Sequence, residues 1–203
     1  MAPFKVNPDA VHEFKDRKAL ERWFARNYDK AGELWIKTHK KGSGLASVSN
    51  AEALDVALCW GWIDAIRKSF DDNSFLQRYT PRGKTSIWST RNQDHVARLI
   101  EEGRMQPSGQ AEIDRAKADG RWGRAYDGSA KMEFPSDLLA AIEDEPRALE
   151  LFQTLNAQNR YALAFRTHHM KTEAGRKKKI ETFVAMLKRG ETIYPNGKGA
   201  KSK

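Results

Sequence analysis

The sequence predicts an α+β fold, with a small, mainly antiparallel sheet in the N-terminal part packed against helices and a helical C-terminal half. Apolar and polar residues alternate in several short runs before about residue 80, as is typical of strands. After Pro135, apolar residues recur at helical spacing. We expect a single domain over residues 1–190, with the sheet in about 1–90 and helices in 91–190, followed by a basic disordered tail at 191–203.

The first 60 residues are predicted to hold two strands and two helices. Residues 3–7 alternate between prolines, which favours a short edge strand. An amphipathic helix is expected from Asp9, and residues 33–40 alternate again as a strand. Ser49 followed by Glu52 is a capping box, which predicts the start of a second helix there.

The middle of the chain predicts a hairpin followed by helices. Residues 62–70 and 74–80 have strand composition, and the polar run Asp71-Asp72-Asn73 between them is typical of a turn. Thr90 with Gln93 forms a second capping-box pattern, and Ser108 is expected to cap a further helix. The remaining helices are expected at about 136–143, 146–155, 157–169 and 173–189.

Composition limits the class of protein. The 203 residues are 39% hydrophobic and 31% charged, and no apolar run approaches the ~18 residues needed to cross a bilayer. The N-terminal residues lack the apolar segment of an export signal, and a single cysteine suits a reducing compartment. We therefore expect a soluble cytoplasmic protein with no transmembrane segment.

The net charge of +9 is concentrated at the C-terminus. Residues 160–203 contain 12 Lys or Arg and 3 Glu, which accounts for all of it. Lys177, Lys178 and Lys179 begin the last predicted helix, where positive charge opposes the helix dipole. One interpretation is nucleic-acid binding through residues 171–203, mostly to phosphate. The other is a solvated helix face followed by a solubilising tail.

Residues 57–92 are the best candidate for a binding site, because they combine three of the six tryptophans with several arginines. Arg67 and Arg78 lie on the paired strands of the predicted hairpin, and Arg82 follows the second strand. We expect the three guanidinium groups to converge on a carboxylate or phosphate. The alternative is that Arg67 or Arg78 pairs with a nearby aspartate and only stabilises the hairpin. The full predicted site comprises Trp62, Asp64, Arg67, Arg78, Arg82, Ser86, Trp88 and Asn92, with donors added by the start of the next helix.

Catalytic and metal chemistry are less well supported by the residues. Asp64 as a general acid or base, or Cys59 as a nucleophile, would make the protein an enzyme. Neither has a partner at a spacing that demands this, so we expect a binding protein. Trp60, Trp62 and Trp88 suit either an aromatic wall or the core. No histidine or cysteine spacing fits a zinc site, and we predict no metal and no cofactor.

Several motifs resemble a known bacterial family. They are ELWIKTHKKGS (33–43), EALDVALCWGWIDAIRKSFDD (52–72), RYTPRGKTSIWSTRN (78–92), LIEEGRMQPSG (99–109), AKADGRW (116–122) and RKKKIETFVAMLKRG (176–190). Together they resemble the bacteriocin-protection, YdeI/OmpD-associated family. The chain departs from the family over residues 168–176, where members commonly carry an Ala-Lys, Thr-Arg pattern. The resemblance implies a stress- or protection-associated protein, which we expect to bind an anionic small molecule or an acidic partner.

Overall fold

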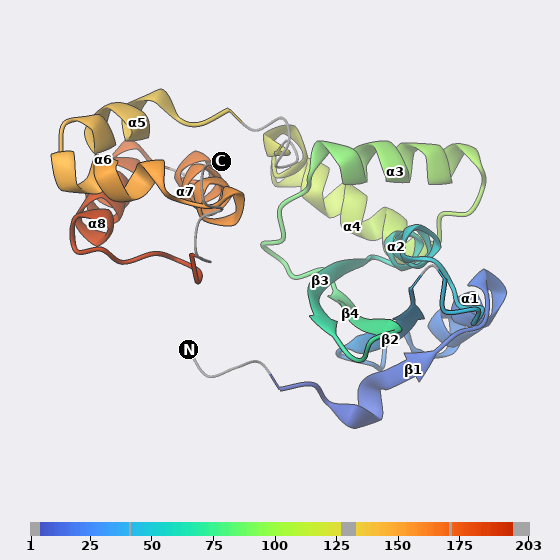
Figure 1. The fold of residues 1–203 in the computed structure, drawn as a ribbon. Helices are drawn as coiled ribbons and strands as arrows, with labels where there is room; N and C mark the ends of the chain where they lie inside the picture. The colour runs from blue at the N-terminus through green and yellow to red at the C-terminus, as the bar shows by residue number, and fades with distance from the viewer. Residues whose placement is uncertain (1–4, 41, 127–132, 171, 197–203) are drawn as a thin grey trace. The chain divides into compact units, whose positions relative to one another are not determined.

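The computed structural model describes residues 5–40, 42–126, 133–170 and 172–196, and the chain divides into two compact units, 1–126 and 127–203 (Figure 1). The predicted α+β class is confirmed, with a four-stranded sheet in the first unit. The division follows Tyr126, whereas we expected the change from sheet to helix near residue 90. The single domain expected over residues 1–190 stays a prediction.

The sheet has the strand order β1-β2-β4-β3. The strands are β1 (Val11–Glu13), β2 (Leu34–His39), β3 (Trp62–Ser69) and β4 (Ser74–Pro81). β3 and β4 form the predicted antiparallel hairpin, β2 pairs antiparallel with β4, and only β1 on β2 is parallel. The register of the hairpin shifts between Asp64 and Arg67, so the regular pairing of β3 with β4 is interrupted there.

The N-terminal segment differs from the prediction. Residues 5–7 form no strand, and a 3-10 turn (η1, Pro8–Ala10) leads into β1, where we expected a helix from Asp9. The Asp16 side chain accepts a 2.7 Å hydrogen bond from the Ala19 backbone N–H, which starts helix α1 (Arg17–Asn27) eight residues later than Asp9. Residues 1–4 of the predicted edge strand lie outside the described residues.

Helices α1 and α2 (Asn50–Cys59) cover one face of the sheet. Ser49 and Glu52 form the predicted capping box at the start of α2. The core between these helices and the sheet is continuous and aromatic-rich, and Trp62 packs edge-on against the rings of Trp23 and Phe24. The buried residues of this core include Leu20, Phe24, Leu34, Ile36, Val56, Ala57, Trp62 and Tyr79.

The opposite side of α2 packs on a second helical layer. This layer contains α3 (Thr90–Glu101), α4 (Pro107–Ala118) and a 3-10 turn η2 (Trp122–Arg124) (Figure 1). The caps differ from those predicted: Ser89 rather than Thr90 caps α3, and α4 begins with Pro107 in its first turn. The Ser108 hydroxyl instead donates to the Trp60 carbonyl, which ties α4 to the end of α2.

The second unit consists of four helices over the residues that the structure describes there. They are α5 (Ser136–Glu143), α6 (Pro146–Gln153), α7 (Ala157–His168) and α8 (Glu173–Lys188), within two residues of the predicted bounds. Their apolar faces enclose a separate core that includes Leu138, Ile142, Phe152, Leu163, Phe183 and Leu187. An ion pair of 2.6 Å between Asp137 and Arg176 joins α5 to α8.

Residues 191–196, which we predicted as the first part of a disordered tail, are bonded to α7. Residues 191–196 return along α7, where the Tyr194 backbone N–H donates to the Asn159 side chain at 2.9 Å. The Asn196 side chain accepts from the Asn156 backbone N–H at 2.8 Å. These bonds satisfy polar groups at the start of α7 and hold the segment in place. Residues 197–203, the rest of the predicted tail, lie outside the described residues.

Candidate functional site

The structure does not bring the three predicted arginines together. The Arg78 Nε donates to the Glu33 carboxylate at 2.6 Å, across from β4 to the residue before β2. The Arg67 Nε donates to the Gln77 side chain at 3.0 Å, and its guanidinium lies 4.5 Å from the Phe75 ring centroid. Gln77 and Arg78 are consecutive on β4 and therefore point to opposite faces of the sheet. Each of these two arginines thus has its own partner.

Arg82 is different, because it is buried and forms no ion pair within 4.0 Å with a described residue, although the carboxylates of Glu112 and Asp64 lie near enough to interact with its charge. Arg82 is the residue after β4 and is only 6% exposed. Its guanidinium carbon lies 3.5 Å from the centroid of the Trp88 ring. One nitrogen, Nη1, donates a long 3.4 Å hydrogen bond to the Ile87 carbonyl. Nε and Nη2 are buried and have no hydrogen-bond partner within the described part of the chain. This arginine therefore has two unused donors in a dry environment.

A second buried arginine lies nearby, and the sequence analysis missed it. Arg121 is also 6% exposed, its Nε donates to both carboxylate oxygens of Asp119, and its Nη1 donates to the Ser86 carbonyl at 2.7 Å. Its Nη2 is buried and unpartnered among the described residues. The repulsion between the two guanidinium groups contributes to the lowered pKa of Arg82. The run Gly120-Arg121-Trp122, noted only as a family motif, was the available signal.

Two indole rings lie near these arginines and are tilted by 54° to one another. The Trp88 ring, which is 1% exposed, lies 5.0 Å from the ring of Trp122, and the Lys117 ammonium lies 5.3 Å from the Trp122 ring centroid. Cations over indole faces are attracted by the negative face of the ring. The contact of the Arg82 guanidinium with the Trp88 ring replaces part of the hydration that the guanidinium loses.

We call the group formed by Arg82, Arg121 and Trp88 the Arg82 centre. Burial determines the protonation of the ionisable side chains in and around it. Desolvation lowers the pKa of Arg82 to about 10, so the group still carries its charge at pH 7. Desolvation raises the pKa of Glu112 and of Tyr126, both of which lie close enough to Arg82 to interact with its charge. Glu112 is hydrogen-bonded to Arg115, and its charge also attracts that of Arg82 without forming an ion pair with it.

Some polar groups of the predicted site are bonded within the protein. The Ser86 hydroxyl accepts from the Gly83 backbone N–H at 3.0 Å. At the start of α3, the Asn92 N–H donates to the Ser89 hydroxyl and the Thr90 N–H donates to the Tyr126 carbonyl. These bonds occupy the backbone donors that we expected to point at an anion.

Trp62 lies in the core of the first unit. Its indole N–H donates to the Tyr28 carbonyl at 3.0 Å, and the residue is 1% exposed. Trp88 belongs to the separate core between α2 and the second helical layer. Trp60 is half-buried and touches both cores. The three indoles therefore do not form a common wall.

The residues of the enzyme alternative show different environments. Burial raises the pKa of the Cys59 thiol to about 11, and the residue is only 4% exposed, which disfavours a reactive thiolate. Asp64 is exposed as a residue, yet surrounding protein atoms desolvate its carboxyl group and raise its pKa. Attraction by Arg82, Arg91 and Arg67 opposes that rise.

The lysine trio lies on the outside of the second unit. Lys177 and Lys178 are exposed, and the Lys179 ammonium lies 5.6 Å from the Phe183 ring centroid on the next turn of α8. Lys171 and residues 197–203 of the predicted nucleic-acid segment lie outside the described residues.

Over the described residues, no three His, Cys, Asp or Glu side chains are grouped to hold a metal ion, and no helix is both long and apolar enough to span a membrane.

The fold and the Arg82 centre define a two-unit α+β protein with a buried cationic centre in its sheet-containing unit. Comparison with known families agrees with the division into units. Residues 131–190 match the model of the family described as bacteriocin-protection, YdeI or OmpD-associated, so the second unit carries that family's domain and the predicted resemblance is confirmed. Residues 12–112 match a domain of unknown function (DUF8412).

The two matches divide the motifs on which the resemblance rested. The four motifs between residues 33 and 109 fall inside the domain of unknown function, and the basic helix at 176–190 falls inside the bacteriocin-protection family. No curated protein and no solved structure matches the chain. The similarity to the bacteriocin-protection family thus covers residues 131–190 of the second unit, and the domain matched in the first unit has no described function.

Proposed function

We propose that this protein is a bacteriocin-protection-associated binding protein of the cytoplasm, and that its first unit binds a small anion at the Arg82 centre. The single observation that supports this proposal is the buried, charged Arg82 side chain whose Nε and Nη2 have no partner within the described residues. An anion bound there would accept hydrogen bonds from those nitrogens and supply the missing negative charge.

Burying a charge without an ion-pair partner costs free energy of folding. Removing a cation from water costs several kcal/mol, and a desolvated cation–π contact returns about 2 kcal/mol of that. Each buried donor left without a partner costs a further ~1–3 kcal/mol. The contact with Trp88, the one long bond to Ile87 and the attraction of the carboxylates of Glu112 and Asp64 still leave Nε and Nη2 of Arg82 without a hydrogen-bond acceptor among the described residues. A bound anion removes this deficit, which makes the free energy of binding available to stabilise the fold.

The surroundings argue for a small ligand. Arg82 and Arg121 are both nearly buried, so a bulky molecule would have to displace the side chains that cover them. The residues that follow Arg82 in the chain, Gly83, Lys84 and Thr85, are exposed, so the backbone next to Arg82 lies at the surface. Phosphate, sulfate and short carboxylates have the size and the acceptor geometry that a guanidinium binds side-on.

The proposal is tested by thermal unfolding and calorimetric titration with phosphate, sulfate, acetate and malonate. We expect at least one of these anions to raise the melting temperature of the wild-type protein saturably, at constant ionic strength. Arg82→Gln removes the charge but keeps a planar polar group, and should abolish the effect. Arg82→Lys keeps the charge without the planar fork, and should weaken binding by about tenfold, the equivalent of ~1.4 kcal/mol.

Arg67→Gln is the matched control, because Arg67 lies on the same hairpin but is already bonded to Gln77. This variant should bind the anion as the wild type does. Equal stabilisation of the wild type and Arg82→Gln by all four anions would refute the proposal, since the effect would then be a general salt effect. So would the absence of stabilisation by any of them.

A further inference from the structure

A second site is suggested by a cleft of about 550 Å³ in the first unit, which does not include the Arg82 centre. It opens between α1, the C-terminal end of α2 and the loop that precedes α4. Its apolar lining comes from Ala25, Val56 and Cys59, and Trp60 adds an aromatic side chain. Ligand sites for small molecules typically have volumes of about 300–1,000 Å³ with apolar walls and a few polar groups, and this cleft fits that description.

Trp60 is held firmly at the edge of this cleft. Its carbonyl accepts from the Ser108 hydroxyl and its N–H donates to the Ala57 carbonyl, each at 3.1 Å. The ring of Tyr28 lies 4.9 Å from the Trp60 ring and supports it. The side chain is half-buried, so part of it remains in contact with solvent. A fixed, partly exposed indole is a favourable surface for stacking a flat ring.

The cleft also carries positive charge that the protein does not neutralise. Lys18 and Arg22 both line it and are one turn apart on α1, so they project from the same side of the helix. Both side chains are exposed, and neither forms an ion pair or a hydrogen bond with any residue that the structure describes. They are thus free to bind an external anion.

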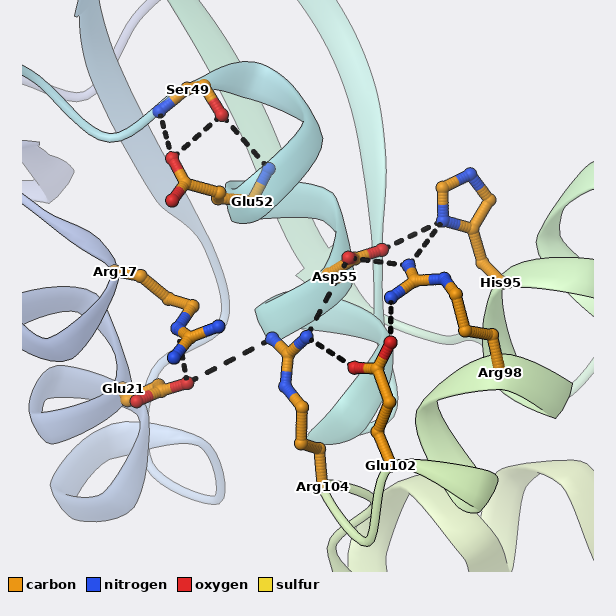
Figure 2. Close-up of polar contacts among 9 residues, drawn as sticks. All are labelled: Arg17, Glu21, Ser49, Glu52, Asp55, His95, Arg98, Glu102 and Arg104. Atoms are coloured by element: carbon orange, nitrogen blue, oxygen red, sulfur yellow. Dashed lines mark hydrogen bonds and ion pairs between the residues drawn. The ribbon is translucent and has the colours of Figure 1, made fainter.

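The third cation of the cleft, Arg104, belongs to a balanced network (Figure 2). Its guanidinium is 2.9 Å from Glu102, while the more distant carboxylates of Asp55 and Glu21 lie at 3.9 and 4.0 Å. In the same network Arg98 binds Asp55 at 2.6 Å, and Arg17 binds Glu21 at 3.3 Å. The network joins the carboxylates of Glu21, Asp55 and Glu102 to the guanidinium groups of Arg17, Arg98 and Arg104, and the His95 ring also contacts Asp55 at 2.8 Å.

Glu21 also lines the cleft, and its negative charge could neutralise the positive charge of Lys18 or Arg22 if it had no other partner. With Glu21 engaged by Arg17 and Arg104, the charge of Lys18 and Arg22 remains as a net positive rim. Opposite charges at such a rim attract ligands of the complementary sign.

We propose that the cleft binds a planar aromatic or heteroaromatic ring that carries a phosphate or carboxylate group. The ring stacks on Trp60 above the apolar lining, and the acidic group binds Lys18 and Arg22. This ligand chemistry is shared by nucleoside monophosphates and by aromatic carboxylates. The site is independent of the Arg82 centre, because no residue is common to the two.

Isothermal titration with AMP, indole-3-acetate and adenosine tests the proposal. We expect AMP, indole-3-acetate or both to bind with a dissociation constant below about 1 mM, and adenosine, which lacks the acidic group, to bind at least about tenfold more weakly than AMP. AMP binding alone assigns the site to nucleotides, and indole-3-acetate binding alone assigns it to aromatic carboxylates. Titration at two salt concentrations should show weaker binding at the higher one.

The variant Lys18→Ala/Arg22→Ala should weaken binding by about tenfold or more, because it removes both charge-assisted contacts. Its matched control is Lys15→Ala/Lys30→Ala, which removes the same charge from exposed positions outside the cleft and should bind normally. Arg82→Gln should also bind normally, which separates this proposal from the function proposed above.

Fluorescence gives a readout that does not depend on charge. A ring stacked on Trp60 should quench part of the tryptophan emission, and Trp60→Phe should lose that part while keeping an aromatic side chain. Unchanged affinity in Lys18→Ala/Arg22→Ala, equal binding of AMP and adenosine, or no binding of either anion up to about 1 mM would each overturn the proposal.

Discussion

Replacing Gly109 with alanine adds a methyl group where α4 meets the end of α2. A Cβ atom built on Gly109 lies 2.1 Å from the Cys59 carbonyl oxygen and 2.6 Å from the Met105 sulfur. Real Cβ atoms do not approach backbone atoms closer than 3.0 Å, so the backbones must separate by about 0.9 Å, the difference between 3.0 and 2.1 Å. The methionine can move, but the carbonyl of a helix end cannot without shifting α2.

The loss of stability follows from the strain at this contact and from the hydrogen bonds that the separation of the two helices breaks. Overpacking typically costs about 1–3 kcal/mol. The Gln106 N–H to Cys59 carbonyl bond and the Ser108 to Trp60 bond, both 3.1 Å, cross the same contact and contribute about 1 kcal/mol each. The higher helix propensity of alanine offsets at most about 1 kcal/mol. We therefore expect Gly109→Ala to lower the free energy of unfolding of the first unit by roughly 3 kcal/mol.

Urea unfolding followed by tryptophan fluorescence measures this loss directly, because all six tryptophans lie within residues 1–126. Gly32→Ala is the matched control, since no atom lies within 4 Å of the Cβ position at Gly32. The control should change the free energy of unfolding by no more than about 1 kcal/mol. A loss below about 1 kcal/mol for Gly109→Ala would refute the close approach of the two helices.

Three further predictions follow from named interactions. Breaking the half-buried pair by Glu33→Gln or Arg78→Gln should lower the unfolding free energy by about 1 kcal/mol, and the double variant should lose less than the sum in urea titrations. With a pKa near 11 against 9.0 for an ordinary thiol, native Cys59 should present about 100-fold less thiolate at pH 8 than the unfolded chain, so disulfide reagents should label it quickly only in urea. The hydrogen bonds from Arg176 hold the pKa of Asp137 below its usual value, so this pair stabilises α5 and α8 above pH 3.8 and the stabilisation is lost as the pH falls through the lowered pKa. Amide exchange in α8 should show this acid loss in the wild type but not in Asp137→Asn.

Local signals in the sequence predicted most helices and the hairpin. The capping box of Ser49 and Glu52 and the 3.6-residue periodicity of α8 depend only on neighbouring residues, so they can be read without the fold. The three-residue strand β1 was missed because its pairing with β2 is nonlocal and its sequence is too short for a pattern.

The contacts of the predicted site residues could not be read from the sequence for the same reason. The partner of Arg78 is Glu33, 45 residues earlier in the chain, and no local spacing indicates it. The neighbour of Arg82 is Arg121, and helices α3 and α4 separate the two residues along the chain. Sequence reasoning identified Arg82 and Trp88 as site candidates from composition, but the burial that distinguishes Arg82 from Arg67 appears only in the structure.

The most direct test of the account is nitrogen-resolved NMR of the arginine Nε–H groups during titration with phosphate at constant ionic strength. The account predicts that the Arg82 Nε–H signal, identified by its loss in Arg82→Gln, shifts saturably and exchanges more slowly with water once the anion accepts its hydrogen bond. A signal for Arg82 that stays unmoved by phosphate, sulfate and short carboxylates alike would contradict the central claim that its free donors bind an anion.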